Sequence, residues 1–251
     1  MFPFAESFDD TGPFTRTAAD MALVWQVLSG RDGAVDTAPL RIGRLGGRFR
    51  ENVDPDQLAA IDALAADAPL VELPDIARAR SAAFVITAFE GGNLHRKALA
   101  AKAMAFDPAT RDRLLAGALL PRALYEEAVR FRDSFRAEVH ALMTRFDGLL
   151  APAAPCAAPL IADPRIAIDG ALSPARADLG IHTQPISFTG LPSLAVPLYR
   201  PGRLPLGLQL IGAPKGEPAL LKLAAQLEAA GVAGATLPPG PITGSQLGAR
   251  Q

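Results

Sequence analysis

Apolar and polar residues alternate with helical spacing in six segments of the chain. In residues 17–30, side chains such as Met21 and Trp25 recur at intervals of three and four, which predicts an amphipathic helix with Trp25 in the core and Gly30 as its C-cap. Aspartate followed by proline, at residues 54–55 and 107–108, is typical of a helix N-terminus. The same spacing predicts further helices over residues 54–66, 76–95, from 107 onward, 121–145 and 217–230.

Short apolar runs between these helices predict strands. Residues 40–45 alternate apolar and polar side chains with period two, whereas the other runs are almost wholly apolar. The predicted strands span residues 40–45, 69–75, 148–155, 193–199 and 204–213. Residues 157–178 hold three prolines and several aspartates, so we expect an irregular loop there. Alternation of strands and helices favours an α/β layer arrangement.

The chain shows no Ser/Gly linker and no internal repeat, which favours one domain over two. We expect residues 1–235 to belong to that single domain. Residues 236–251 are rich in glycine and proline and are predicted to form a loose C-terminal tail.

Composition excludes several classes of protein. Hydrophobic residues make up 49% of the chain and charged residues 20%, with a formal net charge of -1, so neither nucleic acid nor an anionic membrane is an expected partner. One cysteine and three histidines are too few for a zinc site, and no internal disulfide can form. Cys156 lies in an apolar, proline-broken stretch and is interpreted as a buried structural thiol.

Targeting signals are not evident in the sequence. No apolar run approaches the roughly 20 residues that span a bilayer. The first residues carry acids where a signal peptide has basic residues. The expected location is therefore the cytoplasm.

Three stretches resemble the amidase-signature family. SFDDTGPFTRTAAD (Ser7 to Asp20) resembles the segment that follows the signature region of those enzymes, and FDGLLAPAAPCAAP (Phe146 to Pro159) resembles one of their strands. Residues 183–228 resemble their C-terminal strand pair and helix, with GLP-x-x-x-VP and LP-x-G-x-Q at the family's spacing. The resemblance implies an α/β fold with a mixed sheet flanked by helices.

Within the family, FEGGNLH, AFDPATRDRLLAGALLP and HTQPISFTGLP are most similar to the carboxybiuret hydrolase branch of bacterial cyanuric acid catabolism. Related branches act on other small amides or on glutaminyl substrates. The resemblance implies hydrolysis of a small amide or ureide C–N bond without any cofactor. It also implies a small accessory protein subunit, or a homo-oligomer, as a possible partner.

The family's catalytic residues have no counterpart in the sequence. Amidase-signature enzymes use a Ser–cis-Ser–Lys triad, in which a glycine/serine-rich loop carries both serines and donates backbone N–H groups to the oxyanion. Here the four lysines lie outside segments that match catalytic ones, and no serine lies in a glycine loop; the eight serines are residues 7, 29, 81, 134, 173, 187, 193 and 245. In relatives the triad segment precedes the SFD-x-x-GP motif, so we expect the N-terminal part with the catalytic segment to be missing.

Four residues remain as candidates for the substrate side of the site. Arg176 can hold a carboxylate bidentately, although a solvated surface arginine is an equally good interpretation. His182, Thr183 and Gln184 precede Pro185 and can hydrogen-bond a small polar substrate. The alternative is that they satisfy local backbone groups, which is favoured for Thr183 and evenly balanced for Gln184. No metal ligand is proposed.

Two functional hypotheses follow. In the first, the sequence is an N-terminally truncated version of an amidohydrolase of this family. In the second, the short chain is the natural product and acts as a non-catalytic remnant or binding subunit. The second hypothesis predicts a soluble, folded protein of 251 residues without amidase activity. If half of a single sheet is absent, however, unpaired edges and apolar faces are exposed, and such a fragment is expected to aggregate or to depend on a partner.

Overall fold

The computed structural model describes residues 3–31 and 38–235, and the predicted tail at 236–251 lies outside them. The strands are β1 (Ile42–Leu45), β2 (Leu70–Val71), β3 (Gly148–Pro152), β4 (Arg165–Ile168), β5 (Ala171–Pro174), β6 (Ser193–Pro197) and β7 (Gly207–Gly212). The helices are α1 (Ala18–Ser29), α2 (Pro55–Leu64), α3 (Ile76–Leu94), α4 (Arg96–Lys102), α5 (Pro108–Leu119), α6 (Arg122–Met143), α7 (Ala175–Asp178), α8 (Gln184–Thr189) and α9 (Glu217–Ala229), with 3-10 turns η1 (Gly47–Arg50) and η2 (Ala103–Ala105).

A mixed five-stranded sheet forms the centre of the fold, in the order β2-β1-β3-β7-β6. Strand β1 runs parallel to β2 and β3, while β7 runs antiparallel to β3 and β6. All five residues of β3 are buried, as expected for a continuous apolar run between two neighbouring strands with helices on both faces. The expected mixed sheet flanked by helices is confirmed.

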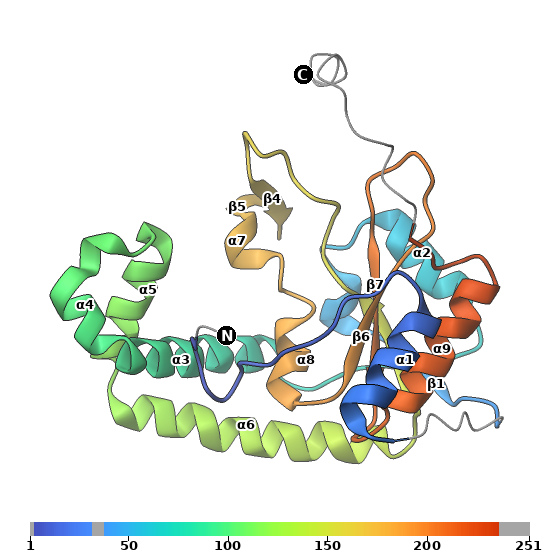
Figure 1. The fold of residues 1–251 in the computed structure, drawn as a ribbon, viewed down its shortest axis with the longest axis horizontal. Coiled ribbons are helices and arrows are strands. Elements are labelled where there is room, and N and C mark those ends of the chain that lie inside the picture. Colours follow the sequence, from blue (N-terminus) through green and yellow to red (C-terminus); the bar gives the residue numbers. More distant parts are fainter. Residues whose placement is uncertain (1–2, 32–37, 236–251) are drawn as a thin grey trace.

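Helices cover both faces of this sheet (Figure 1). On one face, Leu150, Leu208 and Leu210 pack with apolar residues of α2 and α9, and α1 packs beside α9. On the other face, Leu149 and Ile211 pack with α3, α6 and α8. Neighbouring strand residues therefore belong to different cores, because side chains alternate across a strand.

The predicted helix ends are confirmed by their capping bonds. Asp54 and Asp107 accept hydrogen bonds from backbone N–H groups two and three residues later, and each precedes a proline in the first turn. Gly30 adopts a left-handed conformation with φ 66° and donates its N–H to the carbonyl of Gln26. These bonds satisfy backbone groups that a helix end otherwise leaves unpaired.

Helices α3 and α5 pack closely at two glycines. A Cβ added to Gly117 would lie 1.8 Å from the carbonyl oxygen of Ala88, and one added to Gly92 would lie 2.3 Å from the backbone nitrogen of Ala118. Only glycine allows this approach of two helix backbones. The contact fixes α5 against α3 and thereby sets the position of the polar side chains on α5.

The predicted irregular loop at residues 157–178 is wrong. Strands β4 and β5 form an antiparallel hairpin, followed directly by α7. Asp169 and Gly170 form its two-residue turn and have φ values of 51° and 79°, as Asp-Gly does in a turn that matches strand twist. The Asp-Gly pair and the Ile-Ala-Ile alternation before it were the overlooked signals. Helices α4 and α8 were also not predicted.

Helix α1 is less buried than predicted. Trp25 is half-buried rather than part of the core, and Leu28 is 72% exposed. None of the helices in the described ranges is both long and apolar enough to cross a bilayer.

Candidate functional site

Polar side chains from three helical segments meet between α3, α5 and the segment of α7 and α8. The bonds form three groups, in which Arg113 bonds Thr87, Arg176 bonds Asp107 and Thr110, and Arg80 bonds Asp178 and Gln184. Some of the bonded residues are about a hundred positions apart in the chain. We call this set the arginine cluster; its members are Arg80, Thr87, Asp107, Thr110, Arg113, Arg176, Asp178 and Gln184.

Helical spacing explains which side chains face the cluster. On α3, Arg80, Phe84 and Thr87 stand four and three residues apart and share one helix face. On α5, Thr110 and Arg113 are likewise three residues apart. The two faces meet because the glycine contact holds α3 and α5 together.

Arg176 binds α5 rather than being free in solvent. Its guanidinium lies 2.9 Å from the carboxylate of Asp107 and donates to the hydroxyl of Thr110 at 2.7 Å. The backbone bond from Thr110, followed by the bond from Arg176, lowers the pKa of the Asp107 carboxyl below its usual value. The Arg176 side chain remains 63% exposed, so the guanidinium keeps N–H groups that face solvent.

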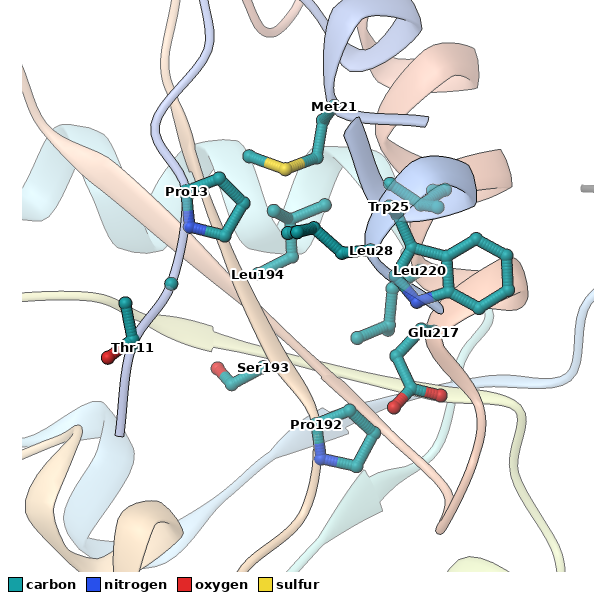
Figure 2. Close-up of a pocket in the computed structure, with 12 residues that line it drawn as sticks. Thr11, Pro13, Met21, Trp25, Leu28, Pro192, Ser193, Leu194, Glu217 and Leu220 are labelled. Carbon is teal, nitrogen blue, oxygen red and sulfur yellow. The ribbon is translucent and has the colours of Figure 1, made fainter. Parts of the chain in front are cut away.

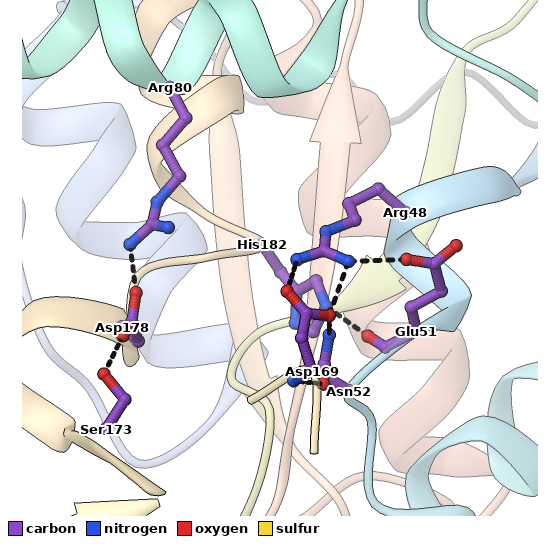
Figure 3. Close-up of polar contacts among 8 residues, drawn as sticks. All are labelled: Arg48, Glu51, Asn52, Arg80, Asp169, Ser173, Asp178 and His182. Atoms are coloured by element: carbon purple, nitrogen blue, oxygen red, sulfur yellow. Dashed lines mark hydrogen bonds and ion pairs between the residues drawn. The ribbon is translucent and has the colours of Figure 1, made fainter. Parts of the chain in front are cut away.

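Gln184 is held by Arg80. The guanidinium of Arg80 donates to Asp178 at 2.6 Å and to the side-chain oxygen of Gln184 at 3.3 Å. Figure 3 shows Ser173 bonded to the same carboxylate from the other side. Burial opposes ionisation of Asp178, yet the bonds from Ser173 and Arg80 outweigh it and lower the pKa of this carboxyl.

Ser173 is not activated by this contact. A carboxylate whose pKa is lowered is a weak base toward a hydroxyl proton, and general-base catalysis needs a pKa near the working pH. The hydroxyl of Ser187 donates to the carbonyl of Thr183, which cannot accept a proton. Neither serine therefore acts as a nucleophile in this arrangement.

His182 is buried away from the cluster. It is fully inaccessible, and its Nε2 lies 3.0 Å from the carbonyl oxygen of Glu51, as Figure 3 shows. Burial, above all, lowers the pKa of the His182 imidazole, so the ring is neutral at pH 7. Thr183 is half-buried and begins α8 without a side-chain capping bond. Arg176 thus bonds α5 and Gln184 bonds α3, whereas His182 bonds the backbone at Glu51.

Arg113 is a further candidate, and no pattern in the sequence distinguishes it. It is half-buried, donates to the Thr87 hydroxyl at 2.5 Å, and has its guanidinium carbon 4.9 Å and 5.7 Å from the ring centres of Phe84 and Phe4. Burial lowers the pKa of this guanidinium, although arginine remains charged at neutral pH. Within residues 3–31 and 38–235, no carboxylate lies within ion-pair distance of it.

The charges of the cluster do not cancel. Arg80, Arg113 and Arg176 contribute positive charge, whereas Asp107 and Asp178 are the carboxylates bonded to them. A half-buried guanidinium without a carboxylate partner among the described residues favours a bound carboxylate, to which it can donate two parallel N–H bonds. The described part of the chain holds no group of three or more His, Cys, Asp or Glu residues that could hold a metal ion.

Comparisons with known proteins agree on one family. Residues 1–221 match the model of the family described as Amidase. AtzE of Pseudomonas sp. (strain ADP), which is one subunit of 1-carboxybiuret hydrolase, is 38% identical over 92% of this chain and 56% of its own length. A glutamyl-tRNA(Gln) amidotransferase subunit from Synechococcus sp. (strain CC9605) is 29% identical over 90% of this chain and 55% of its own length.

The chain is also similar to a solved structure, with a TM-score of 0.87 and 37% sequence identity. That structure is of a vestigial protein complex that reveals the evolutionary origins of an s-triazine catabolic enzyme. The match covers 94% of this chain and 56% of that one. The chain therefore spans about half the length of the relatives that it matches.

Proposed function

Because the chain belongs to the amidase family, we propose that it is part of a hydrolase that cleaves C–N bonds of small carboxylated amides or ureides. The similarity to one of the subunits of a 1-carboxybiuret hydrolase supports this substrate class. The observation that carries the proposal is Arg113, a half-buried guanidinium without a carboxylate partner in the described residues.

The substrate carboxylate would bind Arg113 bidentately, in the setting of Phe84 and Phe4. Gln184 is fixed through its side-chain oxygen by Arg80, which leaves its amide N–H groups to donate to a substrate carbonyl. We propose that Arg176 and Thr183 make further contacts with the substrate at the edge of the arginine cluster. His182 would stabilise the segment that joins α7 to α8 through its bond to the backbone carbonyl of Glu51.

The nucleophile is proposed to come from chain outside these 251 residues. The sequence contains no glycine/serine-rich run that resembles the triad loop. Ser173 bonds only a weakly basic carboxylate, and Ser187 bonds a backbone carbonyl. A lysine and two serines supplied from elsewhere in a longer chain, or by another protein, would complete a Ser–cis-Ser–Lys triad. Residues 1–235 would then form the C-terminal portion of one amidase domain, acting in the cytoplasm.

A second candidate is a non-catalytic binding subunit. The lack of a triad loop in the sequence favours it. In that case the arginine cluster binds a carboxylated ligand without cleaving it, and the chain acts with a small accessory protein or as a homo-oligomer. The two candidates share the binding site and differ only in turnover.

The test is ammonia release from 1-carboxybiuret by the protein isolated from its source at its natural length. Arg113→Met should raise KM at least about tenfold, because a hydrogen-bonded charged group is lost. Hydrolysis of biuret, which lacks the carboxylate, should be unaffected. Arg111→Met is the matched control, since Arg111 pairs with its neighbour Asp112 on the same helix.

An equal loss toward both substrates would show that Arg113 is only structural. If the natural protein releases no ammonia, calorimetric titration with 1-carboxybiuret distinguishes the candidates. Binding that Arg113→Met abolishes would support the binding subunit. No binding would reject both.

A further inference from the structure

A cavity lies on the opposite face of the sheet from the arginine cluster. It has a volume of about 300 Å³ and lies between the segment at residues 11–13, α1, the edge of β6 and the start of α9. Figure 2 shows Met21 and Trp25 of α1 together with Leu194 and Leu220 around it. This volume is at the lower end of the range for small-molecule sites, and the walls are mainly apolar.

One carboxylate interrupts the apolar wall. Glu217 lines the cavity, and its Oε2 is buried with no hydrogen-bond donor in the described residues. Glu217 is also the first residue of α9, where the helix dipole favours a negative charge. A buried carboxylate oxygen without a hydrogen-bond donor costs free energy. This position therefore favours a ligand that donates a hydrogen bond to Glu217.

The aromatic wall favours the same ligand. In Figure 2 the indole of Trp25 and the carboxylate of Glu217 lie on one side of the cavity, opposite Pro13. The face of an indole attracts cations more strongly than any other side-chain ring. None of the described lining residues is lysine, arginine or histidine, so nothing basic in the wall competes for the carboxylate.

We propose that this cavity binds a small organic ammonium ion with a flat apolar body. The ammonium would donate to Glu217 and lie near the Trp25 indole, while the apolar body would pack on Leu194 and Leu220. The arginine cluster, by contrast, favours an anion. The two sites therefore have opposite charge preference, and this proposal does not depend on the hydrolase function.

Trp25 makes the test direct, because it is the single tryptophan among these 251 residues. Titration of the full chain with phenethylammonium should change the tryptophan emission and saturate. Its neutral isostere 2-phenylethanol should bind at least about tenfold more weakly, because it cannot form a charge-assisted bond with Glu217. Glu217→Gln should weaken phenethylammonium binding by a similar factor and leave 2-phenylethanol unchanged.

Glu138→Gln on α6 is the control for loss of one negative charge far from the cavity, and circular dichroism checks that each variant folds. Equal affinity for the ammonium ion and the alcohol would overturn the proposal, because the cavity would then recognise apolar surface alone. So would the lack of a saturable emission change. The comparison of the two ligands needs no variant, so it holds even if Glu217→Gln does not fold.

Discussion

The β4–β5 hairpin and the central sheet are held in place by different forces. Strand β3 is buried along its whole length, and Leu208 on β7 is fully inaccessible. The hairpin has a small apolar cluster of its own, and its turn is tied down by polar bonds. Arg48 and Asn52 both bond Asp169, with Arg48 at 2.6 Å and 2.8 Å (Figure 3).

This difference bears on the candidate site. Arg176, Asp178 and Gln184 follow the hairpin in the chain. If the hairpin loses its structure, we therefore expect these side chains of the arginine cluster to lose their positions as well. Apolar burial depends little on pH or salt, whereas exposed ion pairs are weakened by both. We therefore expect the hairpin and the substrate side of the site to open while the sheet remains folded.

The largest effect is expected from Leu208→Ala. This change removes a buried side chain that packs between β7 and the helices on its face. A loss of about 2–5 kcal/mol in the free energy of unfolding is expected for such a truncation. Urea denaturation measures this free energy of unfolding. A loss below about 1 kcal/mol would show that packing around Leu208 contributes little to the stability of the sheet.

Ile166→Ala is the matched change in the hairpin. Ile166 is buried among Ile168, Ala175 and Ile181. If the hairpin opens by itself, the loss of global stability cannot exceed the free energy of that opening. Urea denaturation should therefore show a loss of less than about 2 kcal/mol, below the range for Leu208→Ala, while hydrogen exchange of the hairpin amides accelerates. Equal global losses would show that the two regions unfold as one unit.

Arg48→Met removes the polar anchor and leaves the apolar cluster intact. Hydrogen exchange at residues 165–174 should accelerate severalfold, because the turn loses its charged bonds. Exchange in β3 and β7 should not change. Arg165→Met is the control, since Arg165 pairs with Asp163 in the preceding loop. Acceleration in the sheet as well would contradict separate anchoring.

The smallest effect is expected from pH. Bonds from Arg48 and then Asn52 lower the pKa of Asp169 from 3.8 to about 2. Because the folded pKa is depressed, the stabilisation is complete above the unfolded value and is lost as pH falls through the folded one. Amide chemical shifts of the hairpin should therefore change as pH falls below about 4, with a midpoint near pH 2. In Asp169→Asn this change should disappear, and a persisting titration would assign it to another carboxylate.

Most helices and strands of the sheet were predictable because their signals are local. The Asp-Pro pairs at residues 54–55 and 107–108 and the left-handed glycine at 30 each determine a helix end within a few residues. The hairpin was predictable too, from Asp169-Gly170, but the prolines around it suggested a loop. Helix α8 carries proline in its first turn and spans only six residues, too short for a periodic pattern.

The candidate site was predicted only in part. Arg176 and Gln184 lie in the cluster, while the environment of His182 was not evident, because its burial depends on Glu51, more than a hundred residues away. Arg113 carried no sequence signal. Its significance comes from the absence of a nearby carboxylate among the described residues, and only the packing of α5 on α3 determines that.

The sequence by itself determined the family, the alternation of strands and helices, and the lack of a serine-rich catalytic loop within these 251 residues. These properties reside in short motifs and in periodicity, which need no distant contact. The tertiary structure decided which arginines are paired, which histidine is buried, and that a carboxylate faces the cavity beside Trp25. Charge pairing and burial are sums over neighbours far apart in the chain, so only the folded arrangement specifies them.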